Sequence, residues 1–555
     1  MKLTVGFLGF FMPLLLWAQQ VVVQDSDIQN GDQVVWTADQ TYILDGLVFV
    51  EEGATLTIEP GTVIKGKAVP TTGDYTSALI ITRGAKIIAD GRPDAPIIFT
   101  AEADDVVDPM DLSLSDRGLW GGLIVLGYAT INTATGVGQI EGIDPNESRA
   151  RYGGGDLPTG PVDTDTSGVL RYVSIRHGGA EIGPGDEING LTLGAVGSGT
   201  VIEYVEVISN LDDGFEWFGG TVNTRYLISA FNADDAFDYD QGFRGKGQFW
   251  FAIQAPDFGG RIAEQDGGTD PEDGQPYAIP VISNVTFIGP GVDPFPQGDG
   301  AQLMIFRDNA GGKYFNSIFT EYNGSGGGAG ITIEDLSGTG EDSRKRLEAG
   351  DLLIQNNIWW QFGDGNDWES IAPQSFVRQH LQANGNQIVD PQLRSISRSM
   401  NGQLDPRPLS NSPASSGAIV LADSFFASVP YLGAFDPNAP LWLERWSALY
   451  QYNVTKIAET ENSGQTWIAT AQLFQNYPNP FNPVTTITYT LQKAAPVRLT
   501  IVNGMGQIVS VLVNRYQTAG TYSVQWNGVR WPSGVYYYQL QAGTNQQVRR
   551  MLLLK

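Results

Sequence analysis

A repeat of 22 residues constrains the fold of this chain more than any other feature. Residues 201–220, VIEYVEVISNLDDGFEWFGG, align with residues 223–242, NTRYLISAFNADDAFDYDQG, at a constant offset of 22. An earlier unit, residues 169–183, joins the series if about ten loop residues near 184–199 are an insertion. Strands of four to six residues in units of this length are typical of coils of a parallel β-solenoid. One coil cannot bury its apolar side alone, so we expect the coils to stack.

Matched positions of the two units carry matched residue types. The pairs are Tyr204 with Tyr226, Asn210 with Asn232, Phe215 with Phe237, and Trp217 with Tyr239. Stacked coils lie about 4.8 Å apart, so these pairs should be neighbours, with the asparagine amides bonding along the axis. Arg171, Glu203 and Arg225 precede equivalent tyrosines and should stack with alternating charge on a solvated face.

Further strand–turn units extend this pattern along most of the chain. They occupy residues 55–66, 78–91, 96–102, 121–132, 284–291, 313–324, 329–336 and 352–360. The 68 glycines and 30 prolines allow the frequent turns that such a fold needs. We therefore predict an all-β fold, a right-handed parallel β-helix over residues 19–452.

Both ends of a solenoid must be covered. We expect residues 28–47 to cap the start and residues 405–452 to cap the far end. The helical spacing of Trp442, Trp446 and Tyr450 is typical of a lid over an apolar core. Residues 453–471 are expected to be a linker.

The sequences at the two ends of the chain are typical of targeting segments. Residues 1–18 combine a lysine, an apolar run too short to span a bilayer, and an alanine, which is the pattern of a signal peptide. No other stretch is long and apolar enough to span a membrane in the mature chain. Residues 472–555 contain six strand-like runs with alternating apolar residues, which predicts a small immunoglobulin-like β-sandwich.

The C-terminal segment resembles the type A sorting domain of the type IX secretion system. The resemblance rests on NYPNPFNP (476–483), AGTYSVQWNG (519–528) and SGVYYYQL (533–540). It implies recognition by the type IX secretion machinery. The chain would then leave the periplasm and be secreted or attached to the outer cell surface.

The body resembles secreted bacterial right-handed β-helix proteins with a pectin-lyase-like fold. The matching strings are GLWGGLIVLG (118–127), GVLRYVSIRHGGAE (168–181) and DDGFEWFGGTVN (212–223). The resemblance implies fold and address, and no settled activity comes with it.

Composition excludes several kinds of function. The net charge of −28 is unsuited to nucleic acid, whose phosphates need a basic surface. The chain has no cysteine, which removes disulfides and thiolate chemistry, and its only histidines are His177 and His380.

The strongest polar constellation is a pair of acidic coils. Asp212, Asp213 and Glu216 on one coil should face Asp234, Asp235 and Asp238 on the next, with Glu181 equivalent to Asp213 on the preceding coil. Clustered carboxylates repel unless solvent, a proton or a cation relieves them. Oxygen ligands suit calcium, which is the predicted cofactor. The acidic loops 162–168 and 266–274 are weaker candidates for calcium.

Three interpretations of the acidic coils remain open. They are solvated turn-capping residues, calcium ligands, or catalytic groups such as Asp213 and Asp235 acting with His177 and Arg244. The leading hypothesis is non-catalytic binding or adhesion to polysaccharide or extracellular matrix. The alternative is a polysaccharide lyase or glycoside hydrolase that uses carboxylates of adjacent coils.

Removal of residues 472–555 is expected to leave the body in the periplasm, because the sorting signal would be missing. Immunoblots of periplasmic, surface and medium fractions would measure this, with the full-length chain as the control. Export of the truncated chain at the full-length level would contradict the assignment.

Overall fold

The computed structural model describes residues 19–555 with short gaps. The residues outside the description are 184, 257, 269, 292–301, 324–327, 339, 364, 456–470, 492–494, 504–507, 519 and 543–544. The predicted signal peptide and most of the predicted linker therefore lie outside the described residues. The chain divides into two compact units, residues 1–458 and 459–555.

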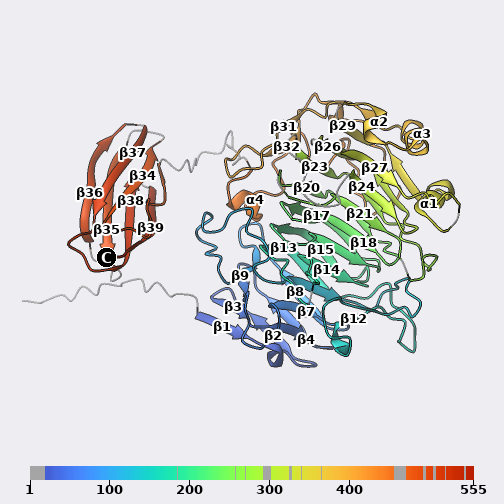
Figure 1. Ribbon diagram of the computed structural model, residues 1–555, viewed down its shortest axis with the longest axis horizontal. Coiled ribbons are helices and arrows are strands. Elements are labelled where there is room, and N and C mark those ends of the chain that lie inside the picture. The colour runs from blue at the N-terminus through green and yellow to red at the C-terminus, as the bar shows by residue number, and fades with distance from the viewer. Residues whose placement is uncertain are drawn as a thin grey trace, which may run out of the picture. The chain divides into compact units, whose positions relative to one another are not determined.

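The first unit is a parallel β-helix with three sheet faces (Figure 1). Face 1 consists, in stacking order, of β4 (Leu47–Val50), β7 (Ala78–Ile81), β10 (Leu123–Leu126), β14 (Leu191–Gly194), β16 (Phe215–Phe218), β18 (Phe237–Asp240), β21 (Ala263–Asp266), β24 (Gln302–Arg307) and β27 (Ala329–Ile333). Every pairing between these strands is parallel.

Faces 2 and 3 share three long strands that bend at a corner, namely β13 (Gly168–Arg176), β15 (Val201–Ile208) and β17 (Asn223–Ala230). Face 2 adds β2 (Gln33–Trp36), β5 (Thr55–Ile58), β8 (Lys86–Asp90), β19 (Lys246–Gln248), β22 (Val281–Ser283), β25 (Gly312–Phe315) and β28 (Leu352–Gln355). Face 3 adds β1 (Gln19–Val23), β3 (Gln40–Leu44), β6 (Val63–Gly66), β9 (Ile97–Ala101), β20 (Phe251–Ile253), β23 (Thr286–Gly291), β26 (Ile318–Tyr322), β29 (Ile358–Phe362) and β30 (Gln387–Ile388).

The strand register confirms the 22-residue coil. Phe215 is the partner of Phe237, and Trp217 is the partner of Tyr239. All four side chains are buried in the core of the helix. On face 2, Glu203 lies between Arg171 and Arg225, with ion-pair distances of 3.5 and 3.9 Å. The expected ladder of alternating charge is therefore present.

The corner between faces 2 and 3 is made by residues with left-handed backbone. Tyr172, Tyr204 and Tyr226 have φ values of 50°, 56° and 57°, a conformation that non-glycine residues seldom adopt. Their rings stack with centroid distances of 4.5 and 4.3 Å. Because the side chains of successive corners pile along the axis, this stacking offsets the backbone strain.

The asparagine ladder also forms between coils. The side-chain oxygen of Asn232 accepts a 2.9 Å hydrogen bond from the backbone N–H of Asn210, and both residues are buried. The Asn210 amide in turn donates to the carbonyl of Asp213 at 2.8 Å. The ladder thus holds the turn that precedes each acidic segment of face 1.

Both predicted caps are wrong. Residues 28–47 contain the ladder strands β2 and β3, because their apolar alternation fits a coil. The far end is covered instead by α2 (Trp368–Ile371) and α3 (Ser375–Ala383), with α1 (Ser343–Ala349) beside it. Val377 and Leu381 of α3 join the same buried cluster as Trp359 of β29.

The segment expected at the far end runs along the side of the β-helix. We call residues 393–455 the side strap; it contains β31 (Leu393–Ser395), β32 (Asp405–Pro408) and α4 (Ala448–Gln451). Its buried residues Leu443 and Trp446 cluster with Ile208 and Ile228 on the outside of face 3. The aromatic stripe is therefore a lid over an apolar surface, but that surface is a sheet face.

The second unit confirms the predicted β-sandwich. One antiparallel sheet contains β33 (Ala471–Leu473), β34 (Val484–Leu491) and β37 (Gly520–Asn527). The other contains β36 (Ile508–Gln517), β35 (Ala495–Asn503), β38 (Gly534–Ala542) and β39 (Asn545–Leu553). Side chains from both sheets, including Ile487, Trp526, Leu499 and Tyr538, form one buried cluster. The sequence reasoning missed β33.

Trp217→Ala is expected to destabilise the β-helix by about 3–5 kcal/mol, because a fully buried ring would leave a cavity between stacked coils. Glu203→Gln is the matched control on the same coils. It should cost about 0–1 kcal/mol, since its ion pairs are about one-third exposed. Urea unfolding followed by circular dichroism would measure both, and equal losses would contradict the assignment of inward and outward positions.

Candidate functional site

The outward side of face 1 carries columns of acidic residues. In β16 and β18 the inward Phe and Trp or Tyr side chains alternate with outward Glu216 and Asp238. The register places Glu216 beside Asp238, and Asp238 beside Glu264 of β21. Asp240 and Asp266, the last residues of β18 and β21, line the same cleft, and burial together with the charge of Asp240 raises the pKa of Asp266. Because strand residues alternate between faces, the carboxylates of β16, β18 and β21 fall on the same outward strip.

A cleft of about 260 Å³ opens over this strip. Its lining consists of Ile140, Glu141, Ile182, Glu187, Ile188, Asn189, Thr192, Asp212, Glu216, Phe218, Asp238, Asp240, Asp266 and Arg307. One wall comes from the chain between β10 and β14, which includes the small hairpin of β11 (Gly138–Gln139) and β12 (Arg151–Tyr152). The cleft therefore has an acidic floor and a partly apolar wall.

The acidic turn before the strands brings three further carboxylates together. One carboxylate oxygen from each of Asp212, Asp213 and Asp234 lies within 4.8 Å of the others. Asp213 also accepts a 2.9 Å hydrogen bond from the backbone N–H of Asp235 on the next coil. The predicted neighbours on adjacent coils are therefore side by side.

Glu181 does not continue this row, contrary to expectation. β14 aligns Leu191 with Phe215, which places Asn189 opposite Asp213. The inserted residues lie mostly before β14, so Glu181 falls in an exposed part of the insertion. Asn189 donates a hydrogen bond to Glu216.

Sequence reasoning also missed Glu264 and Arg307, and it named Asp266 only as part of the acidic loop 266–274. Their strands are offset by 26 and 41 residues from the preceding ones, so a search at 22 passes over them. The alternating string AEQD of β21, which matches FEWF and FDYD, was the available signal.

Burial sets the protonation of the cleft. Burial, and then the neighbouring carboxylates, raise the pKa of Asp213, Glu216 and Asp238 well above its ordinary value. The same causes raise the pKa of Asp212 to about 7. Two like charges 4.8 Å apart repel by about 3 kcal/mol at an effective dielectric constant of about 20. A proton or a cation must relieve part of this repulsion.

Two arginines neutralise only part of the strip. Arg261 lies 2.5 Å from Glu264 and 3.8 Å from Asp235. Arg307 pairs with Asp266 at 2.8 Å, yet burial still raises the pKa of Asp266 to about 7. The Oδ1 atom of Asp238 is buried and has no hydrogen-bond partner within the described part of the chain.

None of the four predicted catalytic residues lines the cleft: Asp213 and Asp235 are buried in the turns before β16 and β18, and His177 and Arg244 lie elsewhere. His177 is fully buried, with its ring nitrogens 2.6 Å from the Asp116 carbonyl oxygen and 3.2 Å from the Tyr452 hydroxyl. Burial lowers its pKa. Arg244 pairs with Asp163 of the acidic loop 162–168 at 3.2 Å.

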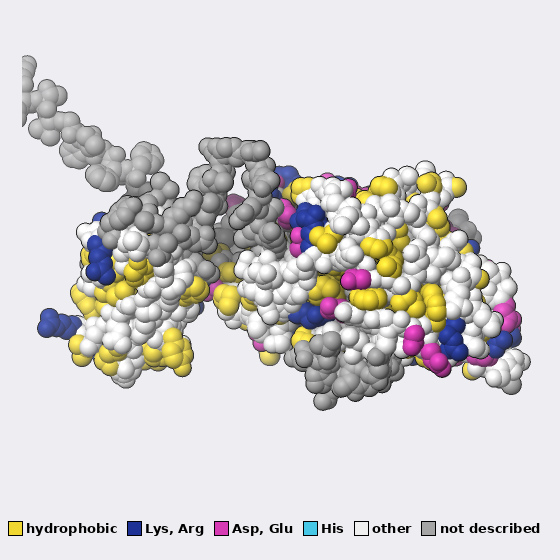
Figure 2. All heavy atoms as spheres, turned by 90° about the horizontal axis from the view of Figure 1, so that it is seen from above, with side chains coloured by type: hydrophobic (Ala, Val, Ile, Leu, Met, Phe, Trp, Pro, Cys, Tyr) yellow, Lys and Arg dark blue, Asp and Glu magenta, His cyan; other side chains and the backbone are white. Residues whose placement is uncertain are grey.

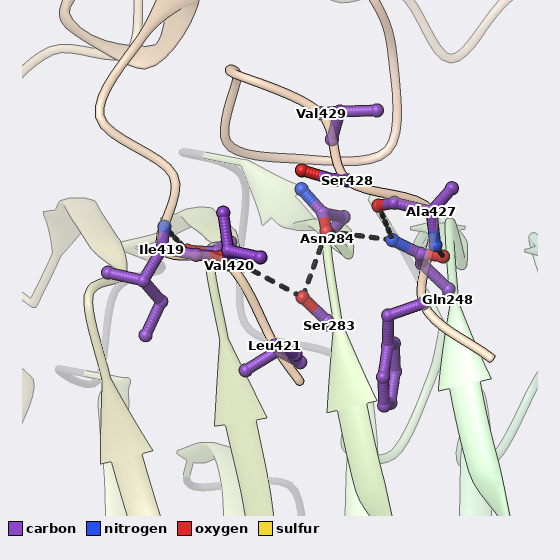
Figure 3. A pocket seen from close by; sticks show the side chains of 11 residues that line it. Gln248, Ser283, Asn284, Ile419, Val420, Leu421, Ala427, Ser428 and Val429 are labelled. Atoms are coloured by element: carbon purple, nitrogen blue, oxygen red, sulfur yellow. Dashed lines mark hydrogen bonds between the residues drawn. The ribbon is translucent and has the colours of Figure 1, made fainter. Parts of the chain in front are cut away.

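A second cavity lies where the side strap meets the corner of faces 2 and 3 (Figure 3). It measures about 10 Å³, which holds at most one water molecule. Gln248 exchanges two hydrogen bonds with the backbone of Ala427, and Asn284 donates to the Tyr431 carbonyl at 2.9 Å. These bonds hold the side strap against the β-helix, so the cavity belongs to a structural contact between the two.

The surface view gives no other strong candidate. Figure 2 shows charged side chains scattered singly or in small groups among uncharged ones on one side of the β-helix unit. This agrees with the exclusion of nucleic acid, which needs a continuous basic surface.

Comparison with known proteins agrees with both units. The model of a pectate-lyase-like β-helix domain matches residues 27–372, and that of a secretion system C-terminal sorting domain matches residues 475–554. No curated protein matches the chain. None of the helices among the described residues is long and apolar enough to cross a membrane.

The sorting domain marks the chain for export by type IX secretion to the cell surface or the extracellular space. The match to the β-helix domain covers more than half of the chain and agrees with the three-faced ladder of parallel strands. The chain therefore belongs to the family of proteins with a pectate-lyase-like β-helix domain.

Proposed function

We propose that this is an exported, non-catalytic binding protein that takes up calcium in the acidic cleft and binds polysaccharide through it. The observation that carries the proposal is the buried Oδ1 atom of Asp238. It lies among like charges and has no partner among the described residues. A buried charged group without a partner is costly, and a cation ligand removes that cost.

Calcium fits the donor set better than a transition metal. At the edge of the cleft, Asp212 and its neighbours Asp213 and Asp234 of the acidic turn offer only oxygen atoms, and the chain has no cysteine. Calcium accepts six to eight oxygen ligands in flexible geometry, including water and ligand groups. Zinc favours nitrogen and sulfur donors.

The cleft suits a sugar polymer once a cation is bound. Open calcium positions accept hydroxyl or carboxylate oxygens of a glycan. Ile140, Ile182 and Phe218 offer apolar surface for the C–H face of a sugar ring. An acidic polysaccharide would be repelled by the cation-free cleft, so its binding should require calcium.

One observation favours the alternative, a polysaccharide lyase or glycoside hydrolase. Asp212, whose pKa is raised to about 7, and Glu216, whose pKa burial raises well above its ordinary value, are suited to donate a proton. The auxiliary groups would come from the cleft itself, for example Arg307, because His177 and Arg244 lie elsewhere.

The cation-free protein is expected to lose stability as pH rises from about 4 to 7. The pKa of Asp212 is raised from 3.8 to about 7, so the folded state binds more protons than the unfolded state in this interval. Each pH unit then lowers the free energy of unfolding by up to about 1.4 kcal/mol per such group. Melting in EDTA across this range would measure the loss.

Asp212→Asn should make that pH dependence shallower. The control is Asp94→Asn, which changes an exposed carboxylate on the same unit. A melting temperature in EDTA that rises between pH 5 and pH 7, or an unchanged slope in the Asp212 variant, would contradict the raised pKa.

Calcium is expected to raise the melting temperature at pH 7.5, because an ion bound only by the folded state stabilises it. Asp212→Asn with Asp234→Asn should abolish this cleft contribution and weaken calcium-dependent retention on immobilised acidic polysaccharide at least tenfold. Asp94→Asn again serves as the control. Retention that is equal in EDTA and calcium would count against the proposal.

The same protein is expected to release no oligosaccharides from a broad glycan panel. Turnover that falls by orders of magnitude in Asp213→Asn or Asp235→Asn would replace the binding function with the enzymatic one.

A further inference from the structure

A second group of carboxylates lies at the carboxyl ends of three face 1 strands. Glu272 belongs to the loop after β21, Asp308 directly follows β24, and Glu334 directly follows β27. One carboxylate oxygen from each lies within 4.8 Å of the others. None of the three lines the acidic cleft. The stacking of coils therefore assembles a second oxygen-rich site from residues far apart in the sequence.

Asn309 adds a neutral amide oxygen next to this group. Its side chain is 1% exposed, and its amide nitrogen donates a 2.9 Å hydrogen bond to the carbonyl of Glu272. The backbone N–H of Asn309 also donates to the Glu334 carboxylate, so Asn309 is held beside the carboxylate cluster. The amide oxygen Oδ1 has no hydrogen-bond partner within the described residues, and neither has the buried Oε1 atom of Glu272. A bound cation would satisfy two buried oxygens that have no hydrogen-bond donor.

The electrostatics point the same way. Burial and the charges of Asp308 and Glu334 raise the pKa of Glu272 to about 7. Arg307 approaches Asp308 at 3.8 Å but makes its shorter contacts with Asp266, at 2.8 Å, and Glu264, at 3.1 Å. Arg307 therefore pairs mainly with the carboxylates of the face 1 strip.

We propose that Glu272, Asp308 and Glu334, together with the side-chain oxygen of Asn309, form a second calcium site outside the cleft. Carboxylates combined with an amide oxygen are a typical calcium donor set. The ion would tie the loop of residues 267–278 to the ends of β24 and β27. That loop crosses the flank of the β-helix, where Asn132 donates to the carbonyl of Gly267 at 2.7 Å. This inference does not depend on glycan binding or on calcium in the cleft.

Titration calorimetry with calcium chloride alone tests the proposal on the mature full chain after EDTA treatment. The test variant is Glu272→Gln with Glu334→Gln, which keeps the side-chain shapes and the oxygen that accepts the 3.0 Å bond from the Asp308 N–H. The control is Glu348→Gln, an exposed carboxylate paired with Arg344 outside the cluster. The cleft variant, Asp212→Asn with Asp234→Asn, is measured in parallel.

The test variant is expected to bind one calcium fewer per chain than the wild type and the control. The cleft variant should keep this ion. The loss of calcium from one site can therefore be distinguished from its loss at the other. In EDTA the test variant should melt at or above the wild-type temperature, because two like charges are removed. In calcium it should melt below the wild type. The opposite order of melting in EDTA would mean that the glutamates only support the fold, and would overturn the proposal.

An unchanged number of bound ions and an unchanged calcium shift in the test variant would also overturn it. The proposal would also be overturned if acidification stabilised the wild type while calcium failed to stabilise the cleft variant. Protonation of Glu272 would then relieve the cluster without an ion.

Discussion

The β-helix depends on one constraint, which is that the inward side chains of a coil are buried only by the coils above and below. Face 1 shows this directly, since Phe215 and Trp217 pack on Phe237 and Tyr239 in register. The same spacing stacks whatever lies at the corners, so tyrosines with left-handed backbone become a continuous aromatic column. A coil that lost its partner would expose its core, which is why the far end needs α2 and α3.

Equivalent residues of successive coils also stack on the outside of the β-helix. There the stacking is unfavourable when the residues carry the same charge. On face 2 the chain alternates arginine and glutamate, so Arg171, Glu203 and Arg225 form a favourable ladder. On face 1 the equivalent outward positions repeat carboxylates, as Glu216, Asp238 and Glu264 show. The chain therefore alternates charge on face 2 but repeats like charges on face 1, which is locally unfavourable. Such locally unfavourable arrangements concentrate at functional sites.

Both acidic sites belong to face 1 and the turns at its edges, and each includes a buried oxygen without a donor among the described residues, Asp238 Oδ1 in the first and Glu272 Oε1 in the second. The chain carries no disulfide, and its export places it outside the cell. Cation binding at these positions would link coils across the stack, as a disulfide links distant segments in other exported proteins. Stability and ligand binding would then respond to the same ion.

The sequence by itself determined the coil length, the inward and outward positions of the repeated units, the acidic pair of coils and the C-terminal sandwich. Each follows from local periodicity, which a single segment displays. It misplaced the caps, because the amphipathic stripe of Trp442 and Trp446 shows that a surface is covered but not which one. Likewise, Glu264 and Arg307 became site residues only through strand pairing across offsets of 26 and 41 residues. Tertiary structure decided these points because loops of unequal length separate residues in sequence that the 4.8 Å stacking of coils brings together in space.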